Sequence, residues 1–521
     1  MKNILSSPWF ILINVLLSTF LAIFSVAGTI IAEGNIQGDL ALSESLSQWV
    51  TTIYLLGVNT MVPAATRFAD RFLYKRVYAA GVLVFTIGSG LTPLIANFPW
   101  IATCRFIEGL GAGAIFPVGM ALIVRHFPKE RIGLALCLYI GIAFGGGLGV
   151  GLFLAGYLAQ FHSWHLIFYG VIPFGLLLAF SCHEIKEDQK PIKHPFDIWG
   201  WLCLALAIAS LLVAISNGAL SSTAAGWRAP WILACLTIFV LSLISLIVIE
   251  EHHPEPIIPT KLFLDPIFST SATALFLLGM ALFAGLSTSE FFLIDGVGYE
   301  RYIAGAVGMS YGITIALFSI VAGALGKIIP TMVLSLSGLS FLVLSYFLNH
   351  SITWQCGWRE ILPLLMLRGV GVGLALGPTT AQALKRVPEV MGGTAATLLT
   401  FFRQVGGTFG GAFFTVFQIR RIIFHNARFG EQANQWLPGY RVALKHVETR
   451  MSQLLSQGIE SSEKANAILI ANIKKQAFIQ GLNDACFIFG WITLVVAIIL
   501  FVLSVRAAIQ RKTTTAPESG A

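Results

Sequence analysis

An apolar run from about residue 100 to 124 carries two ionisable side chains, Arg105 and Glu108. The run is long enough to cross a bilayer as a helix, because about 20 apolar residues span the hydrocarbon core. A charged side chain at the centre of such a helix costs at least about 2.5 kcal/mol on insertion scales. Arg105 and Glu108 are three residues apart, so they share one helix face and can neutralise each other. The pair predicts either an internal lock between helices or an intramembrane ionisable site that serves transport.

A ladder of glycines follows this pair, and the whole pattern occurs a second time. Residues 109–113 alternate glycine with apolar residues, which strips one flank of the helix and lets a neighbouring helix approach. In the second copy Arg368 begins a similar ladder over residues 368–373, and each copy precedes a basic loop and a glycine-rich apolar run. The repeated order indicates a duplicated multi-helix unit, which is typical of secondary transporters with a substrate site between the halves. The glycines predicted to pack helices together are Gly109, Gly111, Gly113, Gly147 and Gly151.

The composition is typical of a polytopic membrane protein. The chain is 56% hydrophobic and 11% charged, whereas a soluble chain carries about 25% charged residues. The formal net charge of +8 lies mainly in short loops, which indicates membrane topology rather than a nucleic-acid partner. All cysteines except Cys356 fall in predicted spans, so we expect no disulfide framework and no metal site. Because no nucleophile triad or phosphate-binding loop is present, we expect a protein that is not an enzyme and holds no cofactor.

The hydropathy pattern predicts an all-α protein with fourteen membrane spans. The expected spans are 9–32, 47–66, 77–97, 99–124, 132–158, 164–182, 198–217, 229–250, 268–289, 303–325, 329–347, 361–382, 393–418 and 483–505. The split between the tenth and eleventh rests on Gly326-Lys327 alone. Two spans lie between the duplicated halves, so the expected domains are 1–183 (six helices), 184–266 (linker and two inserted helices) and 267–521 (six helices).

The distribution of Lys and Arg predicts the orientation. On one side of the expected membrane, the short loops hold only Arg228, Arg301 and Arg359, and the other side holds many more. Cytoplasmic loops carry the excess of positive charge, so both termini are expected in the cytoplasm. An even number of spans agrees with this distribution.

A long polar segment over residues 420–478 precedes the last span, on the expected external side. Leu444, Val447 and Met451 recur at helical spacing, and Ser461 is placed to start a second helix that continues into the last span. The segment is either a solvated helical cap or a docking surface for a partner. In a cell with two membranes, the expected partner is a periplasmic adaptor that leads to an outer-membrane channel.

The second expected loop mixes one acid with several bases. Its charged residues include Asp70, Arg71, Lys75 and Arg76. One acid among the bases of a cytoplasmic hairpin can form a charge relay that holds one conformation of a transporter. The alternative is simple anchoring of the loop on the cytoplasmic side.

Five short motifs carry a family resemblance: Gln48-Trp49-Val50, the Asp70-Arg71 loop, Arg105…Gly109…Gly111, Pro173-Phe174-Gly175 and Arg403-Gln404-Val405-Gly406-Gly407. In these motifs the chain resembles the fourteen-span drug:proton antiporters of the major facilitator superfamily, the EmrB/QacA type. The resemblance covers nearly the whole chain and implies a 6 + 2 + 6 helical fold in the inner membrane. It also implies a gating role for the Asp70 loop and a role in proton coupling for Arg105, with the proton gradient as the energy source.

Several positions depart from the family pattern. Thr66 and Leu73 stand where the gating loop usually has glycine, and Leu152 stands where the fifth span usually has proline. Ala27 replaces the family's acid of the first span, and Glu108 replaces the usual glutamine. The chain is therefore expected to be a divergent member.

Because Ala27 cannot carry a proton, another acid must do so, and the candidates are Glu33, Glu108, Glu290 and Asp295. Glu108 is preferred because it lies deep in a span, where burial and Arg105 act on its charge in opposite directions. Protonation would then release Arg105, for which substrate could compete. Arg368 and Arg403 are further candidates for proton coupling or transport.

These features predict a proton-coupled exporter of amphipathic small molecules that works by alternating access. A second hypothesis is a dedicated exporter of one metabolite, such as a siderophore. A third, of another class, is a non-transporting membrane receptor or assembly factor built on the same fold.

Overall fold

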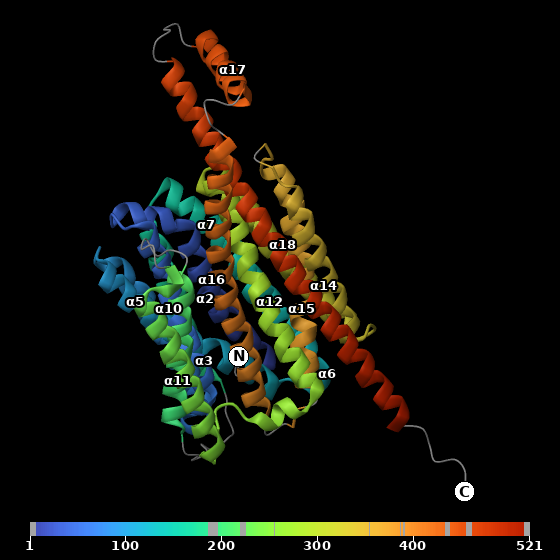
Figure 1. Cartoon of the computed structure of the whole chain (residues 1–521). Coiled ribbons are helices and arrows are strands. Elements are labelled where there is room, and N and C mark those ends of the chain that lie inside the picture. Colours follow the sequence, from blue (N-terminus) through green and yellow to red (C-terminus); the bar gives the residue numbers. More distant parts are fainter. Residues whose placement is uncertain are drawn as a thin grey trace.

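The structure is a computed structural model. It describes residues 7–185, 196–218, 226–254, 256–353, 355–385, 387–388, 391–432, 438–454 and 461–514. Within these ranges the regular elements are helices, joined by short loops and 3-10 turns. Figure 1 shows a bundle of long helices, with α17 and the adjoining ends of α16 and α18 projecting beyond it.

The first half contains α2 (Pro8–Asp39), α3 (Glu44–Phe72), α4 (Tyr74–Leu91), α5 (Phe98–His126), α6 (Lys129–Leu138), the π-helix η2 (Tyr139–Gly146), α7 (Gly147–Phe161), α8 (His165–Tyr169) and α9 (Val171–Ser181). The inserted pair is α10 (Ile198–Gly218) and α11 (Pro230–His252). The second half contains α12 (Pro266–Glu290), the π-helix η6 (Phe291–Val297), α13 (Arg301–Leu325), α14 (Thr331–Leu348), α15 (Trp358–Leu384), α16 (Gly392–Gln432), α17 (Pro438–Leu454) and α18 (Ser461–Thr514).

The expected all-α membrane fold is confirmed, and the count of fourteen spans stays a prediction. Among the described residues, 12 helices are long and apolar enough to cross a membrane. The two expected spans that do not meet this criterion, 47–66 and 393–418, coincide with α3 and α16. These helices carry polar side chains that face each other inside the bundle, where Asn59 of α3 donates to Thr408 of α16 at 2.7 Å. Their low hydropathy therefore follows from their interior position. The tenth and eleventh spans are separate helices, α13 and α14.

Glycines set the closest helix contacts, as the ladder predicts. A Cβ added at Gly109 would lie 2.2 Å from the Tyr54 carbonyl oxygen of α3, and one at Gly113 would lie 2.6 Å from the Val58 carbonyl oxygen. Gly111 packs equally closely on α4. Side chains at these positions would push the helices apart, so the glycines hold α5 against both neighbours.

The two halves pack directly on each other along α7 and α13. A Cβ at Gly312 of α13 would lie 2.3 Å from the backbone nitrogen of Gly149 in α7. Gly147 and Gly151 face the other way, against Phe20 and Phe24 of α2. Helix α7 is therefore wedged between the first helix of its own half and the second half.

The inserted helices cover a different junction. Helix α10 contacts both α3 and α16, and its Trp201 indole donates to the Thr60 carbonyl of α3 at 2.7 Å. Phe68 of α3 stacks on Phe196, just before α10, with ring centroids 4.7 Å apart. Helix α11 packs outside α10, and most of its side chains face outward.

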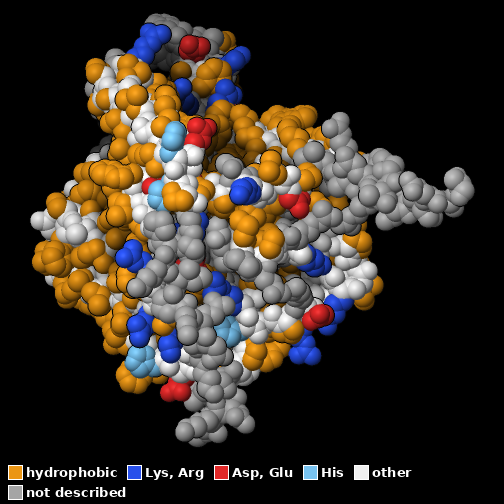
Figure 2. All heavy atoms as spheres, turned by 90° about the horizontal axis from the view of Figure 1, so that it is seen from below, with side chains coloured by type: hydrophobic (Ala, Val, Ile, Leu, Met, Phe, Trp, Pro, Cys, Tyr) orange, Lys and Arg blue, Asp and Glu red, His pale blue; other side chains and the backbone are white. Residues whose placement is uncertain are grey.

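The segment 420–478 is largely helical, because α16 continues into it and α18 begins within it. The helix expected from Ser461 into the last span is present as α18. Leu444 and Val447 of α17 are half-buried, and the Tyr440 hydroxyl of α17 donates to Asn466 of α18. These two side chains of the predicted apolar stripe are therefore covered, and the side chain of Met451 lies outside the described residues. Figure 2 views the opposite end of the molecule, where Lys and Arg side chains are spread among hydrophobic ones.

Candidate transport site: a buried ion pair and an interhelical cavity

Arg105 and Glu108 form an ion pair inside the first half. The Arg105 Nη1 lies 2.7 Å from Glu108 Oε2, and both side chains are fully buried. The second carboxylate oxygen accepts a hydrogen bond of 2.5 Å from the Ser25 hydroxyl of α2. The two charges therefore neutralise each other, and Ser25 adds a hydrogen bond from α2.

Arg105 also holds α3. Its Nε donates to the Val50 carbonyl at 3.3 Å, and its guanidinium lies over the Tyr54 ring, 4.3 Å from the centroid. A desolvated cation over an aromatic ring is stabilised by about 2 kcal/mol. The approach is close because Gly109, on the next turn of α5, has no side chain. Three helices, α2, α3 and α5, thus meet at this pair.

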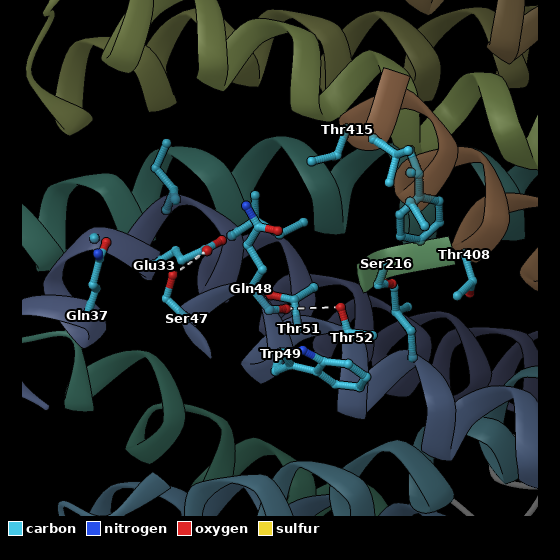
Figure 3. A pocket seen from close by; sticks show the side chains of 18 of the residues that line it. Glu33, Gln37, Ser47, Gln48, Trp49, Thr51, Thr52, Ser216, Thr408 and Thr415 are labelled. Atoms are coloured by element: carbon cyan, nitrogen blue, oxygen red, sulfur yellow. Dashed lines mark hydrogen bonds between the residues drawn. The ribbon is translucent and has the colours of Figure 1, made fainter. Parts of the chain in front are cut away.

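A cavity of about 400 Å³ lies at the end of the bundle nearest α17. Both halves contribute to it, through α2 and α3 on one side and α12, α13 and α16 on the other, and α10 supplies Leu212 and Ser216. Its labelled side chains are mostly polar (Figure 3), and the Ser47 hydroxyl donates to Glu33 at 2.8 Å. The lining includes charged groups of both signs, Glu33, Asp295 and Arg301. Such a cavity suits an organic molecule with both polar and apolar parts.

The ion pair does not line this cavity. Helix α3 separates the two sites, because Thr51, Thr52 and Leu55 face the cavity, whereas Val50 and Tyr54 face Arg105. Direct competition between substrate and Glu108 for Arg105, which the sequence suggests, has no path in this conformation. The ion pair and the cavity therefore contact opposite sides of the same helix, α3.

The cavity is closed at the other end by contacts between the halves. The hydroxyls of Thr66 in α3 and Thr397 in α16 lie 2.6 Å apart. Nearer the cavity, Asn59 donates to Thr408, whose hydroxyl also donates to the Gln404 carbonyl at 2.9 Å. Thr66 stands where the resembled family has glycine, and a glycine could not make this contact.

The other two predicted arginines lie in the second half. Arg368 of α15 is fully buried and donates to the Ser345 hydroxyl at 3.3 Å and to Asn349 Oδ1 at 3.4 Å. Arg403 of α16 is 2% exposed, with its guanidinium 4.2 Å from the centroid of the Phe144 ring. Neither has a carboxylate within ion-pair distance among the described residues.

The predicted gating loop forms a compact contact around Asp70. The Tyr74 hydroxyl donates to Asp70 at 2.7 Å, and Arg125 Nη2 lies 3.4 Å from the same carboxylate oxygen. Lys75 donates to the Ile185 carbonyl at 3.3 Å. Arg71 and Arg76 are exposed, and Arg71 lies over the neighbouring Phe72 ring. Of the predicted residues, Asp70 therefore binds α4 and α5, Lys75 binds the backbone that follows α9, and Arg71 and Arg76 face outward.

The remaining candidate acids fall into two groups. Glu33 and Asp295 line the cavity, which makes them reachable from it. The side chain of Glu290 lies outside the described residues. Ala27, in place of the family's acid, lies against Gly151 of α7, where an added Cβ would be 3.0 Å away. Among the described residues, no three His, Cys, Asp or Glu side chains gather as a metal site.

The sequence did not indicate several residues that complete these sites. Ser25, Tyr54 and Phe144 are ordinary residues of apolar spans, and nothing in their spacing marks them. Asn59 and Thr408 give a weak signal, because each is a polar residue in the middle of an expected span.

A duplicated helical bundle with a cavity between its halves is the architecture of a secondary transporter. A profile of the Major Facilitator Superfamily matches residues 15–197 and 198–411, and the chain belongs to this superfamily. It is therefore a multi-pass transporter of a small molecule across a lipid bilayer, and not an enzyme.

Curated relatives indicate a multidrug-type member that has diverged. The chain is 24% identical over 493 residues to "Uncharacterized MFS-type transporter YhcA" of Bacillus subtilis (strain 168), covering 94% of this chain and 91% of that protein. It is 29% identical to "Multidrug resistance protein Stp" of Mycobacterium tuberculosis (strain ATCC 25618 / H37Rv), covering 73% and 70%. It is 27% identical to "Puromycin resistance protein pur8" of Streptomyces alboniger, covering 78% and 80%.

Solved structures confirm the fold. The proton:xylose symporter XylE has a TM-score of 0.59 at 13% identity, with 95% of each chain covered. A bacterial homologue of the human lysosomal transporter Spinster, inward-facing and unoccupied, has a TM-score of 0.60 at 14% identity, with 95% of this chain and 97% of that chain covered.

Proposed function

We propose that this protein is a proton-coupled exporter of amphipathic small molecules that works by alternating access in the inner membrane. The observation that carries the proposal is the cavity between the halves, which is lined by both and closed at its other end by the Asn59–Thr408 and Thr66–Thr397 contacts. Breaking these contacts and forming others near the cavity mouth would present the site to the other side. The relatives named for multidrug and puromycin resistance support export as the direction.

The buried ion pair supplies a route from a proton to the cavity. A proton on Glu108 cancels the carboxylate charge and weakens its hold on Arg105. Arg105 in turn holds the Val50 carbonyl of α3. Because α3 forms both the cavity wall and the closing contact at Thr66, a change at the pair acts on access to the cavity. The coupling therefore runs through the position of α3, and substrate need not touch Arg105.

The test is transport by purified protein in liposomes under an imposed pH gradient, with ethidium as the probe. Glu108→Gln should abolish the gradient-driven component and leave ethidium binding within about twofold of wild type. Glu130→Gln is the matched control, because Glu130 is an exposed acid on the adjacent α6. Wild-type rates for Glu108→Gln across a pH gradient would show that the pair is structural and that another acid couples.

Deletion of the gene separates broad export from a dedicated exporter. Broad export predicts that deletion sensitises cells to many unrelated dyes. A dedicated exporter predicts accumulation of one compound, such as a siderophore, in an untargeted comparison of secreted molecules. Neither effect, together with no flux in liposomes, favours a receptor or assembly factor on this fold.

We also propose that the exposed face of α17 docks a periplasmic adaptor that leads to an outer-membrane channel. The supporting observation is that α17 lies beyond the bundle (Figure 1). Val442, Lys445 and His446 are exposed on it, whereas Leu444 and Val447 are half-buried. A photocrosslinker at position 442 should capture a periplasmic protein, and one at half-buried position 444 should not. Capture of lipid or of this chain alone from position 442 would leave α17 as a cap.

A further inference from the structure

Arg403 is a cation buried at the centre of the molecule, where the two halves meet. It projects from α16 of the second half onto η2 of the first half, with its guanidinium over Phe144 and the Tyr139 hydroxyl as a hydrogen-bond partner. Tyr139 in turn lies 3.2 Å from the Thr19 hydroxyl of α2. All of these partners are electrically neutral, so the charge of Arg403 is not balanced by its surroundings.

The guanidinium also has free hydrogen-bonding capacity. Its Nε and Nη2 are buried without a hydrogen-bond partner. Arg105 and Arg368 differ from Arg403. Each has one buried nitrogen without a hydrogen-bond partner, and each donates a hydrogen bond from its Nε. A buried donor that lacks an acceptor is destabilising, and a buried cation without a counter-charge more so. Two adjacent donors of a guanidinium match the geometry of a carboxylate or phosphate group.

The buried charges inside the described spans have a positive balance. Among the Asp, Glu, Lys and Arg side chains that the structure describes within the spans, the buried ones are Arg105, Glu108, Arg368 and Arg403. Glu108 is the one carboxylate among them, and Arg105 already neutralises it. An interior of this sign favours an anion, as rings of arginine do in anion pores.

Arg403 also lies directly beyond the floor of the cavity. Gly407 and Thr408, one helical turn further along α16, line the cavity. The Asn59–Thr408 hydrogen bond lies between Arg403 and the cavity. The Asn59 Oδ1 is buried and accepts no hydrogen bond. Between Arg403 and the opposite end of the bundle lies the Thr66–Thr397 contact. Opening the halves at this contact would uncover Arg403 from the side opposite the cavity.

We propose that Arg403 is the recognition site for an anionic group of the cargo, a carboxylate or phosphate on an amphipathic molecule. This inference rests on the proposed exporter function and names its substrate class. Cargo binds Arg403 while the halves are open at Thr66–Thr397, and its anion takes the place of the Phe144 ring. When the halves close, Phe144 and Tyr139 hold the guanidinium again, as in this structure. The cargo then moves from Arg403 into the cavity on the α17 side.

Equilibrium binding to the purified full-length protein tests this assignment with two matched probes. Carboxyfluorescein is an anionic amphiphile, ethidium is a cationic one, and fluorescence anisotropy reports both. Arg403→Gln should weaken carboxyfluorescein binding by about tenfold to hundredfold, because a charge-assisted hydrogen bond is lost, and change ethidium binding by less than about twofold. Arg403→Lys should lie between, because it keeps the charge and loses the two-pronged geometry.

Arg428→Gln is the control, because Arg428 is an exposed arginine on the same helix. Equal effects of the two glutamine variants, or equal losses of both probes in Arg403→Gln, would overturn the proposal. If Arg403→Gln fails to fold, Arg403→Lys carries the same comparison. Binding of inorganic phosphate at Arg403 without binding of carboxyfluorescein would also overturn the assignment to cargo.

The two proposals fail in different ways. Wild-type protein that binds and exports ethidium but does not bind carboxyfluorescein would remove the anion site and leave export standing. Binding of carboxyfluorescein that depends on Arg403, without flux of either probe in liposomes, would support the anion site and remove export.

Discussion

Helices α5 and α15 are packed alike and charged differently. A Cβ at Gly109 of α5 would meet the Tyr54 carbonyl oxygen of α3, and one at Gly369 of α15 would meet the Tyr311 carbonyl oxygen of α13 at 2.8 Å. Each tyrosine donates its hydroxyl to a carbonyl in the first helix of its own half. The glycine ladders therefore occupy equivalent places in the two halves.

The residue before the first glycine is the point of difference. This residue is Glu108 in α5 and Arg368 in α15. By its place in the helix packing, Arg368 is therefore equivalent to Glu108 and not to Arg105. Arg368 donates hydrogen bonds to the neutral side chains of Ser345 and Asn349, whereas Arg105 forms an ion pair with Glu108. The comparison teaches that the glycines set the helix contacts, whereas the residue before the first glycine is free to carry a charge of either sign.

The largest effect is expected for Arg105→Met. It leaves Glu108 as a buried carboxylate without its counter-charge, which should lower the free energy of unfolding by about 3–5 kcal/mol. Denaturation in mixed SDS micelles measures this loss. Adding Glu108→Gln to the same chain should restore part of it, and no recovery in the double variant would contradict an ion-pair origin.

Arg368→Met should cost less, about 1.5–3 kcal/mol, because it removes the charge together with its hydrogen bonds and leaves no buried ion without a counter-charge. The same denaturation assay compares it with Arg105→Met. Equal costs for the two substitutions would break the distinction between the halves, and would mean that an acid outside the described contacts pairs with Arg368.

The loops after α3 and α13 extend the comparison to the ends of the helices. Leu73 alone separates α3 from α4 and has φ 78°, whereas residues 326–330 connect α13 to α14 without a positive φ. A non-glycine residue in this region is strained by about 1–3 kcal/mol. Leu73→Gly should therefore stabilise the protein, by about 1 kcal/mol after the entropy cost of glycine. A lower melting temperature for Leu73→Gly would show that the Leu73 side chain is needed more than the strain is harmful.

The smallest effect is expected where the halves touch. Thr66→Val removes the hydroxyl contact with Thr397 and keeps the shape of the side chain. It should weaken the contact between α3 and α16 by about 0.5–1.5 kcal/mol. Hydrogen–deuterium exchange over residues 60–70 of α3 should become faster, with exchange in α4 unchanged. Thr397→Val should have the same effect, and the double variant should add little. Additive effects would mean that the two hydroxyls do not act on each other.

Much of the fold could be predicted, because duplication, hydropathy and glycine spacing are local patterns. The partnership of Arg105 with Glu108 follows from their spacing on one helix. Their separation from the cavity does not, because spacing gives a shared face and not the helix that the face meets. Arg403 could be marked by the family motif, but its position over Phe144 depends on how α16 meets η2 across the halves. Likewise, α3 and α16 look like weak spans because polar side chains inside a bundle and in a loop have the same sequence signal.

Helix α10 determines which routes to the cavity remain open. On one side, α7 and α13 meet backbone to backbone through glycines, which leaves no room for a lipid tail. On the other side, α10 lies across α3 and α16, and its Leu212 and Ser216 form part of the wall. Among the described residues, packed helices therefore border the cavity on both of these flanks. Helix α10 thus covers the α3–α16 flank of the cavity, and we expect its removal to expose this flank to lipid.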